Sequence, residues 1–430
     1  MKQLPYLDAH GDDGYQVLRY DLDLSYHPGS NRLAGRALVT AVARSALNGV
    51  SLDLGAFRVD RVLFDGRQVR FAHRLGKLRV RPGRELAPGT EFTVEVRYSG
   101  IPRPIRGHWG EIGWNQLDDG ALVASQPTGA PSWFPCNDRP ADKAAYRIAV
   151  TTAPAYAVVA NGVLVSRTSG RAGTTWVYDQ PEPTSTYLVT VQIGRYELLE
   201  IASGPVRQPA AVPARLLRAF RHDFADQPRM VRAFERFFGP YPFAEYGIVV
   251  VDEDLDVPVE AQGMSIFGAN HVDGRGGAEH LVAHELAHQW FGNSVTVADW
   301  RDIWLHEGFA NYAEWLWAEE AGRSCHELAQ RSRAGLARLP QDISIGAPGV
   351  RRIFDDRVYQ RGALTLHALR LTLGDERFFP LLREWTRRYR HSVASSADFV
   401  GLAQRYSDAD LAPLFQSWLS ETALPHLPDY

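Results

Sequence analysis

Two histidines four positions apart, with a glutamate directly after the first, could hold and use a metal ion. They are His284 and His288, and the glutamate is Glu285. Because residues four apart lie on one face of a helix, both imidazoles can reach the same ion. Glu285 lies one step round the helix, where a base must sit to take a proton from a metal-activated water. The spacing therefore predicts a hydrolytic metal site.

A third ligand is expected from Glu307, which lies on the next helical pattern along the chain. Catalytic zinc takes three protein ligands and keeps one position open, so His284, His288 and Glu307 would bind one zinc ion per chain. The alternative is two histidines on a solvated or core helix face. Glu307 weakens that alternative, because its helix is rich in aromatic residues and an unpaired carboxylate is costly to bury there.

These residues need a helix to align them, and residues 278–292 have the apolar spacing of one, without an interrupting proline. Earlier in the chain the pattern is different. Apolar and polar residues alternate over 20–26, 91–98 and 146–150, which predicts antiparallel strands with one buried face. Helical spacing begins near Pro228. We therefore expect a β-rich domain over 1–203 and a second, mainly helical domain over 204–430.

Composition limits the class of protein. The chain has 430 residues, 45% of them hydrophobic, and a net charge of −3. Two or three domains fit this length, and the charge gives no reason to expect a nucleic-acid partner. No run approaches the roughly 18 apolar residues of a membrane span, and the first fourteen residues contain no signal core. Two cysteines favour a reducing compartment. We expect a cytoplasmic protein.

Several motifs resemble the aminopeptidase N family of zinc metallopeptidases. Each lies at the expected place along the chain: Tyr20–Leu24 resembles the opening strand, Phe134–Pro140 a Phe-Pro-Cys-x-Asp-x-Pro signature, His288–Asn293 the end of the zinc helix, Trp304–Ala310 the segment of the third ligand, and Tyr359–Ala363 a Tyr-x-Lys-Gly-Ala segment with Arg361 in place of lysine. Five separated matches in the right order are far more specific than one.

The resemblance implies a fold and an activity. The fold would be α+β: an antiparallel β-sandwich or saddle-like N-terminal domain, followed by a thermolysin-like, mainly helical catalytic domain. The activity would be zinc-dependent removal of N-terminal residues from peptides. The hydroxyl of Tyr359 would stabilise the oxyanion, a role that suits a phenol donor aimed at developing charge. Without the resemblance, Tyr359 is a partly buried tyrosine at a helix start.

An aminopeptidase must also bind the free amine of its substrate. The family uses a glutamate in a Gly-x-Met-Glu-Asn segment, which is followed by a glycine. When the chain is aligned with this segment so that both the glutamate and the following glycine are kept, the matching residues are Glu260 and Gly263. The alternative for Glu260 is membership of an acidic surface run with the preceding residues 252–256. Gln126 takes the place of a second family glutamate. Its amide can accept a hydrogen bond from an ammonium group but brings no charge.

Other features are secondary. Longer family members continue into a helical domain that covers the active site, and this chain resembles a short form without it. Among the neighbours of Glu307, we expect Asp302 to cap a helix and Glu314 to lie on a solvated face. His306 should point away from the metal because of the helix rotation.

The hypothesis is a zinc aminopeptidase acting on peptides with a free N-terminus, without a nucleic-acid or membrane partner. The sequence makes no prediction about oligomeric state. Two alternatives stay open: a zinc endopeptidase with the same site, and a non-catalytic scaffold of the same family.

Overall fold

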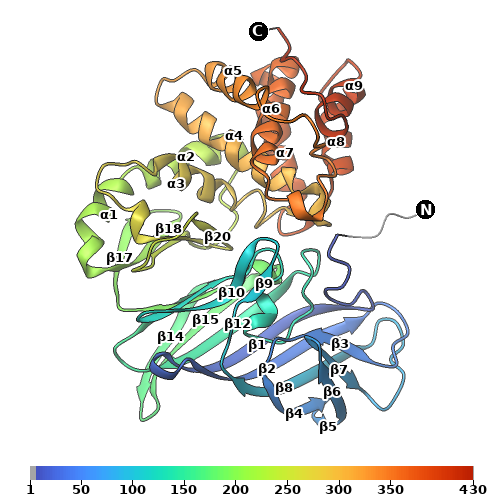
Figure 1. Ribbon diagram of the computed structural model, residues 1–430, viewed down its shortest axis with the longest axis vertical. Coiled ribbons are helices and arrows are strands. Elements are labelled where there is room, and N and C mark those ends of the chain that lie inside the picture. Colours follow the sequence, from blue (N-terminus) through green and yellow to red (C-terminus); the bar gives the residue numbers. More distant parts are fainter. Residues whose placement is uncertain (1–5, 430) are drawn as a thin grey trace. The chain divides into compact units, whose positions relative to one another are not determined.

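The structure, a computed structural model, describes residues 6–429 (Figure 1). These residues form two compact units. The β-unit comprises Asp8–Leu217 and Phe243–Asn270, and the helical unit comprises Arg218–Pro242 and residues 271–429 together with residues 6 and 7. Within the described residues, no helix is both long enough and apolar enough to cross a membrane.

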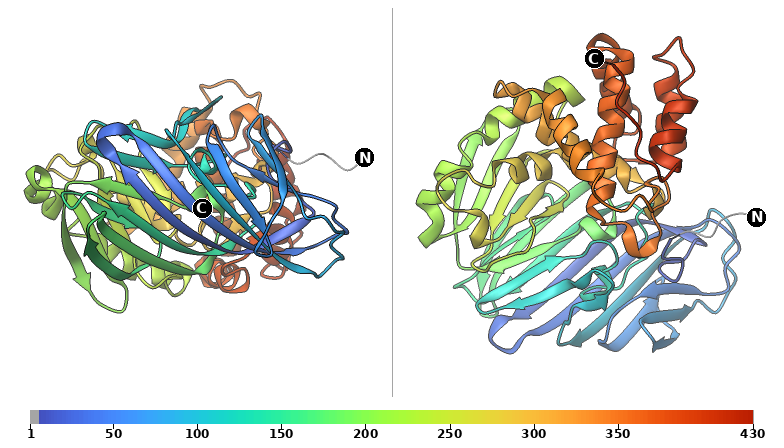
Figure 2. Two further views of the ribbon diagram at one scale, coloured as in Figure 1. Left: turned by 90° about the horizontal axis from the view of Figure 1, so that it is seen from below. Right: turned by 45° about the horizontal axis from the view of Figure 1, so that its top comes forward.

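An eight-stranded sheet dominates the β-unit, and its strands run side by side in Figure 2. Its order is β14 (Val163–Gly170), β15 (Gly173–Thr184), β12 (Ala144–Thr152), β1 (Tyr15–His27), β2 (Arg32–Ala43), β8 (Glu91–Gly100), β4 (Arg58–Phe64) and β5 (Arg67–Gln68). The apolar members of the predicted alternating runs, Tyr20 to Tyr26 among them, are buried, so these strand predictions are confirmed. One detail differs: β1 and β12 are parallel, whereas we expected antiparallel neighbours.

Three smaller sheets complete the β-unit. One contains β13 (Ala157–Ala160), β16 (Val191–Gly194), β11 (Gly120–Ala124), β10 (Gly110–Leu117) and β9 (Ile105–Gly107). A second contains β3 (Val50–Asp53), β7 (Lys77–Arg81) and β6 (Arg70–Arg74). The third contains β17 (Tyr196–Ser203), β18 (Arg207–Pro213), β19 (Gly247–Val250), β21 (Met264–Phe267) and β20 (Val259–Ala261).

The third sheet explains where the boundary between the two compact units lies. The division expected at 203/204 falls between β17 and β18, which pair as antiparallel neighbours. β18 then pairs in parallel with β19, and β19 with β21. Because strands from both sides of residue 203 share hydrogen bonds in one sheet, the compact β-unit extends to Leu217 and takes in Phe243–Asn270.

The helical unit contains the helices that follow β18, and Figure 1 labels each of them. They are α1 (Leu217–Asp223, whose first residue belongs to the β-unit), α2 (Gln227–Phe238), α3 (Glu279–Ala287), α4 (Trp304–Glu320), α5 (Cys325–Leu336), α6 (Asp356–Leu373), α7 (Asp375–Arg388), α8 (Ser396–Gln404) and α9 (Ala412–Phe415). A short pair of strands, β22 (Thr296–Val297) and β23 (Val393–Ala394), joins distant parts of this unit.

Helix α3 is shorter than the predicted 278–292. It ends at Ala287, and His288 is its C-cap. Beyond that point the amides of Gln289 and Trp290 bond to carbonyls three residues back, and Gly292 has a φ of +117°. Left-handed backbone of this kind favours glycine. The apolar spacing typical of a helix thus continues past Ala287, but the backbone there forms a tight turn instead of α-helix.

The glycine-rich segment before α3 is held in place. The amides of Gly274 and Gly276 donate hydrogen bonds of 2.8 and 2.9 Å to the carboxylate of Asp223, at the end of α1. These two contacts hold the segment in a tight approach to the start of α3.

Candidate active site

The three predicted ligands meet in the helical unit. His284 lies in α3, His288 caps it, and Glu307 lies in the first turn of α4. The Oε2 atom of Glu307 is 3.6 Å from Nε2 of His284 and 3.4 Å from Nε2 of His288. Among the described residues, this is the one group of three such side chains whose ligand atoms gather closely enough to hold a metal ion. The donor set is therefore two imidazole nitrogens and one carboxylate.

The other nitrogen of each imidazole is also held. Nδ1 of His284 lies 2.7 Å from Oε1 of Glu314, and Nδ1 of His288 lies 3.0 Å from the carbonyl oxygen of Phe291. An Nδ1–H donated to these acceptors leaves the Nε2 lone pairs for a metal and fixes the ring orientations. The prediction that Glu314 lies on a solvated face is wrong. Glu314 is seven residues after Glu307, so two helical turns bring it to the same side of α4.

The electrostatics of the group favour a cation. Burial alone would lower the pKa of His284, but hydrogen bonds to Glu307 and Glu314 raise it well above its ordinary value. Burial likewise works to raise the pKa of Glu307, but the neighbouring charge of His288 and the hydrogen bond to His284 hold it far below the usual range. The site thus favours positive charge beside the Glu307 carboxylate. A metal ion would take the place of the protons, because its ligands must be deprotonated.

Glu285 and Tyr359 lie beside this group. Glu285 is in α3 between the two histidines and is 4% exposed. Tyr359 is in the first turns of α6, half-buried, and its ring stacks on that of His284 with centroids 6.1 Å apart and planes 18° apart. A carboxylate and a phenol thus accompany the three ligands. Proton transfer and stabilisation of negative charge are the chemistry that such groups supply.

Two further neighbours of Glu307 have structural contacts. His306 accepts a hydrogen bond from the amide of Val297 at its Nε2 atom (2.9 Å), which agrees with its predicted exclusion from the metal site. Asp302 does not cap a helix, contrary to expectation. Its Oδ1 atom accepts a 2.5 Å hydrogen bond from the hydroxyl of Ser396, and the cap of this short turn is Asp299. Asp302 is buried, so this contact satisfies a carboxylate inside the fold.

The three residues predicted to bind the substrate lie in the β-unit. Gln126 donates a 2.7 Å hydrogen bond from Nε2 to Oε1 of Glu260. Glu260 is on β20 and 8% exposed, whereas Asp252, Asp254 and Asp256 of the acidic run are exposed. Glu260 therefore differs from the residues of that run: its side chain is buried, and it accepts a hydrogen bond from the amide of Gln126.

Gly263 occupies the turn that joins β20 to β21. Its φ is +79°, a conformation that favours glycine, and its carbonyl accepts a 2.8 Å hydrogen bond from the amide of Gly247. Gly263, which matches the glycine of the family segment, therefore has a role in the turn that follows Glu260.

Sequence reasoning assigned no role to Arg361, which occupies the lysine position of the Tyr-x-Lys-Gly-Ala segment. Its side chain is buried, and its guanidinium donates to backbone carbonyls near the end of the described chain. The substitution of arginine for lysine was the signal available in the sequence, because arginine offers five donors in a fixed plane.

Comparisons with known proteins agree with this arrangement. Residues 16–188 match the peptidase M1 N-terminal domain, and residues 224–418 match the peptidase family M1 domain. The crystal structure of an M1 zinc metallopeptidase from Deinococcus radiodurans is similar with a TM-score of 0.91 and 31% sequence identity, over 98% of each chain. A mutant of that protein bound to a Tyr-Ser-Ala substrate is similar with a TM-score of 0.90. The predicted pairing of a β-rich domain with a helical catalytic domain is confirmed.

Curated relatives carry aminopeptidase names. The chain is 24% identical over 401 residues to a leucyl aminopeptidase of Saccharolobus solfataricus, covering 87% of this chain and 50% of the relative. It is 26% identical over 404 residues to a probable aminopeptidase 2 of Sulfurisphaera tokodaii, covering 88% of this chain and 50% of the relative. The chain thus spans about half the length of these two relatives.

Proposed function

The chain belongs to the peptidase M1 family, and on this premise we propose that it is a zinc aminopeptidase that removes N-terminal residues from peptides. The observation that carries the proposal is the convergence of His284, His288 and Glu307, with the buried Glu285 next to His284 in α3 and Tyr359 stacked on His284. Relatives named as aminopeptidases support the reaction class.

The residues fit zinc. Two imidazole Nε2 atoms and one carboxylate oxygen are a known ligand set of catalytic zinc sites. Glu314 and the carbonyl of Phe291 hold the opposite nitrogens, which is the usual support of a ligating histidine. When bound, zinc would polarise the scissile carbonyl and make water a stronger acid.

The protein groups carry out the proton transfers. Glu285 accepts a proton from the water that attacks the carbonyl carbon. The C–N bond then breaks, and Glu285 delivers the proton to the leaving nitrogen. Tyr359 donates a hydrogen bond to the carbonyl oxygen as negative charge develops there, so it stabilises the transition state more than the substrate.

Recognition of the free amine is assigned to Glu260. A buried carboxylate attracts an ammonium group more strongly than an exposed one, because water screens it less. Gln126 holds the Oε1 atom of Glu260 in one orientation through its own amide. The assignment rests on the family motif and on this contact, and Gly263 contributes through the turn that it forms. A preference for peptides over other amides and a cytoplasmic location are part of the same proposal.

One experiment tests the function: hydrolysis of aminoacyl amides and short peptides, free and N-acetylated, by the wild type and by Glu285→Gln. We expect cleavage of free-amine substrates alone, with activity lost in the variant while about one zinc per chain is retained. Removing the base should cost about 10²-fold or more in kcat.

Other outcomes would redirect the assignment. Cleavage of blocked peptides would indicate an endopeptidase and would remove Glu260 from amine recognition. Bound zinc without cleavage of any substrate would indicate a non-catalytic scaffold. Absence of zinc from a folded chain would contradict the metal site itself, and His288→Ala provides the matched zinc-free reference.

A further inference from the structure

We propose that Arg361 is a positioning residue for Tyr359: by binding the backbone at residues 417–423, its guanidinium fixes the first turns of α6 and with them the tyrosine hydroxyl. The inference rests on the proposed function, because it gives Tyr359 its role in the reaction. It adds a residue whose guanidinium donates to the backbone of residues 417–423, away from the metal ligands.

Every nitrogen of the Arg361 guanidinium group donates to a backbone carbonyl oxygen. Nε donates to the carbonyl oxygen of Trp418 (2.8 Å) and Nη1 to that of Thr422 (2.8 Å). Nη2 lies within 2.6–3.0 Å of three more carbonyl oxygens, those of Ser417, Glu421 and Ala423. All five partners are backbone atoms of one segment, which we call the C-terminal clamp segment (417–423).

This segment is where a helix ends. Helix α9 continues into the wider turns of Gln416–Ser420, and Glu421 then takes up an extended conformation. The last carbonyls of a helix lack partners within it and carry its negative dipole end, so a buried cation satisfies both their hydrogen bonds and their charge. Arg361 is 2% exposed, and burial lowers its pKa to about 10, which still leaves it charged at neutral pH.

The position of Arg361 on α6 links the clamp to the site. Tyr359 and Arg361 are two residues apart, so they project from nearly opposite sides of the helix. Tyr359 stacks on His284 on one side, while Arg361 holds the C-terminal clamp segment on the other. A rotation or shift of these turns would move the tyrosine hydroxyl relative to His284. The clamp resists that movement because five hydrogen bonds would have to lengthen together.

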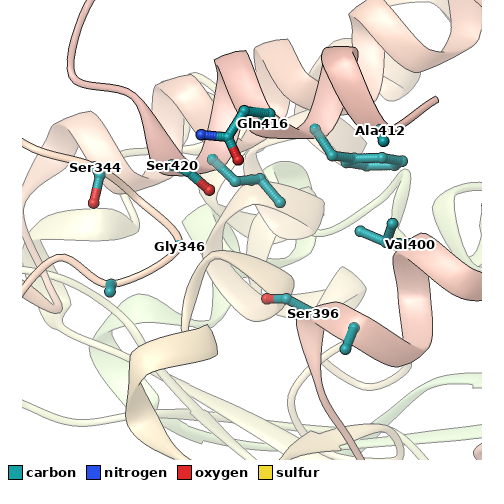
Figure 3. A pocket seen from close by; sticks show the side chains of 11 residues that line it. Ser344, Gly346, Ser396, Val400, Ala412, Gln416 and Ser420 are labelled. Atoms are coloured by element: carbon teal, nitrogen blue, oxygen red, sulfur yellow. The ribbon is translucent and has the colours of Figure 1, made fainter. Parts of the chain in front are cut away.

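A pocket borders part of this region. Gln416 and Ser420 line a pocket of about 550 Å3, together with Ser344, Ser396 and Val400 (Figure 3). Leu419 and Ser420 of the clamp segment border this pocket, and the side chains of Trp418 and Leu419 are themselves buried. The guanidinium therefore acts together with these buried side chains in holding the clamp segment.

The test compares Arg361→Lys with the wild type, in the native background and in Tyr359→Phe. Lysine keeps the charge but offers three donors without the planar fork. We expect Arg361→Lys to lower kcat by about tenfold to a hundredfold with KM and zinc content nearly unchanged, since a misplacement of about 1 Å can cost that much. In the Tyr359→Phe background, the same substitution should have almost no further effect on kcat.

A matched control uses the second arginine that binds this end of the chain. Arg333, on α5, donates a 2.6 Å hydrogen bond from Nε to the carbonyl of Pro425. Arg333→Lys should reduce thermal stability and leave kcat within about twofold, because Arg333 lies on α5 and contacts Pro425 and His426, which are outside the clamp segment. If Arg361→Lys does not fold, Arg361→Gln, which leaves no buried charge, replaces it in the same comparison.

The outcomes separate the two levels of the argument. Equal losses of kcat from Arg361→Lys in both backgrounds, or a normal kcat in the single variant, would overturn the positioning role while leaving the aminopeptidase intact. A normal kcat in Tyr359→Phe alone would overturn the role of Tyr359 in the proposed function, and the positioning role with it.

Discussion

Gly308 and Gly362 bring helices α4 and α6 into backbone contact. A methyl group added at Gly308 would lie 2.7 Å from Cα of Gly362, closer than real carbon contacts allow. Gly308 follows Glu307, and Gly362 follows Arg361. The spacing between the third ligand and the helix of Tyr359 is therefore set by two residues that have no side chain.

The first prediction follows from this contact. Gly308→Ala should lower the free energy of unfolding by about 1–3 kcal/mol, the usual cost of overpacking, and should also lower kcat because α6 must move away from α4. Thermal denaturation and steady-state kinetics measure the two effects. Gly401→Ala on α8 is the control: its added methyl meets nothing within 4 Å, so stability should rise slightly. An unchanged Gly308→Ala protein would contradict the packing argument.

The second prediction concerns zinc affinity. Glu314→Ala should weaken zinc binding by about 10–100-fold, because Nδ1 of His284 loses the acceptor that orients its ring. Chelator competition measures the affinity. Asp302→Asn is the comparison variant: it alters a buried carboxylate near α4 and should reduce stability while zinc affinity is kept. Equal zinc affinities in Glu314→Ala and the wild type would exclude a supporting role for Glu314.

The third prediction concerns the amine. Glu260→Gln should raise KM for free-amine substrates by about tenfold to a hundredfold, since a hydrogen bond to a charged group contributes about 1.5–3 kcal/mol. Gln126→Ala should have a smaller effect in the same direction, because it only loosens the carboxylate. Asp254→Asn, from the exposed acidic run, should leave KM unchanged. A KM in Glu260→Gln equal to that of the wild type would place the amine site elsewhere.

The fourth prediction concerns pH and a second buried histidine. His367 on α6 is 2% exposed, and burial together with the nearby His326 and Arg370 lowers its pKa from 6.5 to about 4. Between these values the unfolded chain binds more protons at this position than the folded one. The free energy of unfolding is therefore not reduced by His367 above about pH 6.5. As the pH falls towards 4, protonation of this residue in the unfolded chain lowers the free energy of unfolding by about 3 kcal/mol in total.

The measurement is the free energy of unfolding across this pH window in wild type and His367→Gln. The variant should show a shallower decline on acidification, and the exposed His280→Gln should keep the full slope. Identical slopes in wild type and His367→Gln would show that His367 titrates normally in the folded protein.

Much of the site could be read from spacing alone. His284 and His288 lie one helical turn apart in any α-helix, and Glu285 must then lie beside them, so local geometry decides their arrangement. The alternating strands were likewise predictable, because residues such as Tyr20 and Leu22 must share one face. Glu307 could be chosen from the family motif and from the cost of burying it.

Contacts between distant segments were not predictable in this way. Glu314 was expected to face solvent, yet it holds His284, because the crossing of α3 and α4 decides which side of α4 is buried. Helix α3 ends at Ala287 because the chain turns at Gly292, although the apolar spacing continues past Ala287. The parallel pairing of β1 with β12 depends on the order of strands in the sheet.

The spacing of residues along the chain was enough to predict the ligand types, their order and the helix that aligns two of them, because these depend on a repeat of a few residues. Three relationships became visible only in the folded chain: how Glu307 approaches the histidines, which acceptors hold their opposite nitrogens, and how Arg361 and the pair Gly308 and Gly362 fix α6. Those relationships depend on packing between segments far apart in the chain, and the local spacing of residues does not encode the angles and distances at which helices meet.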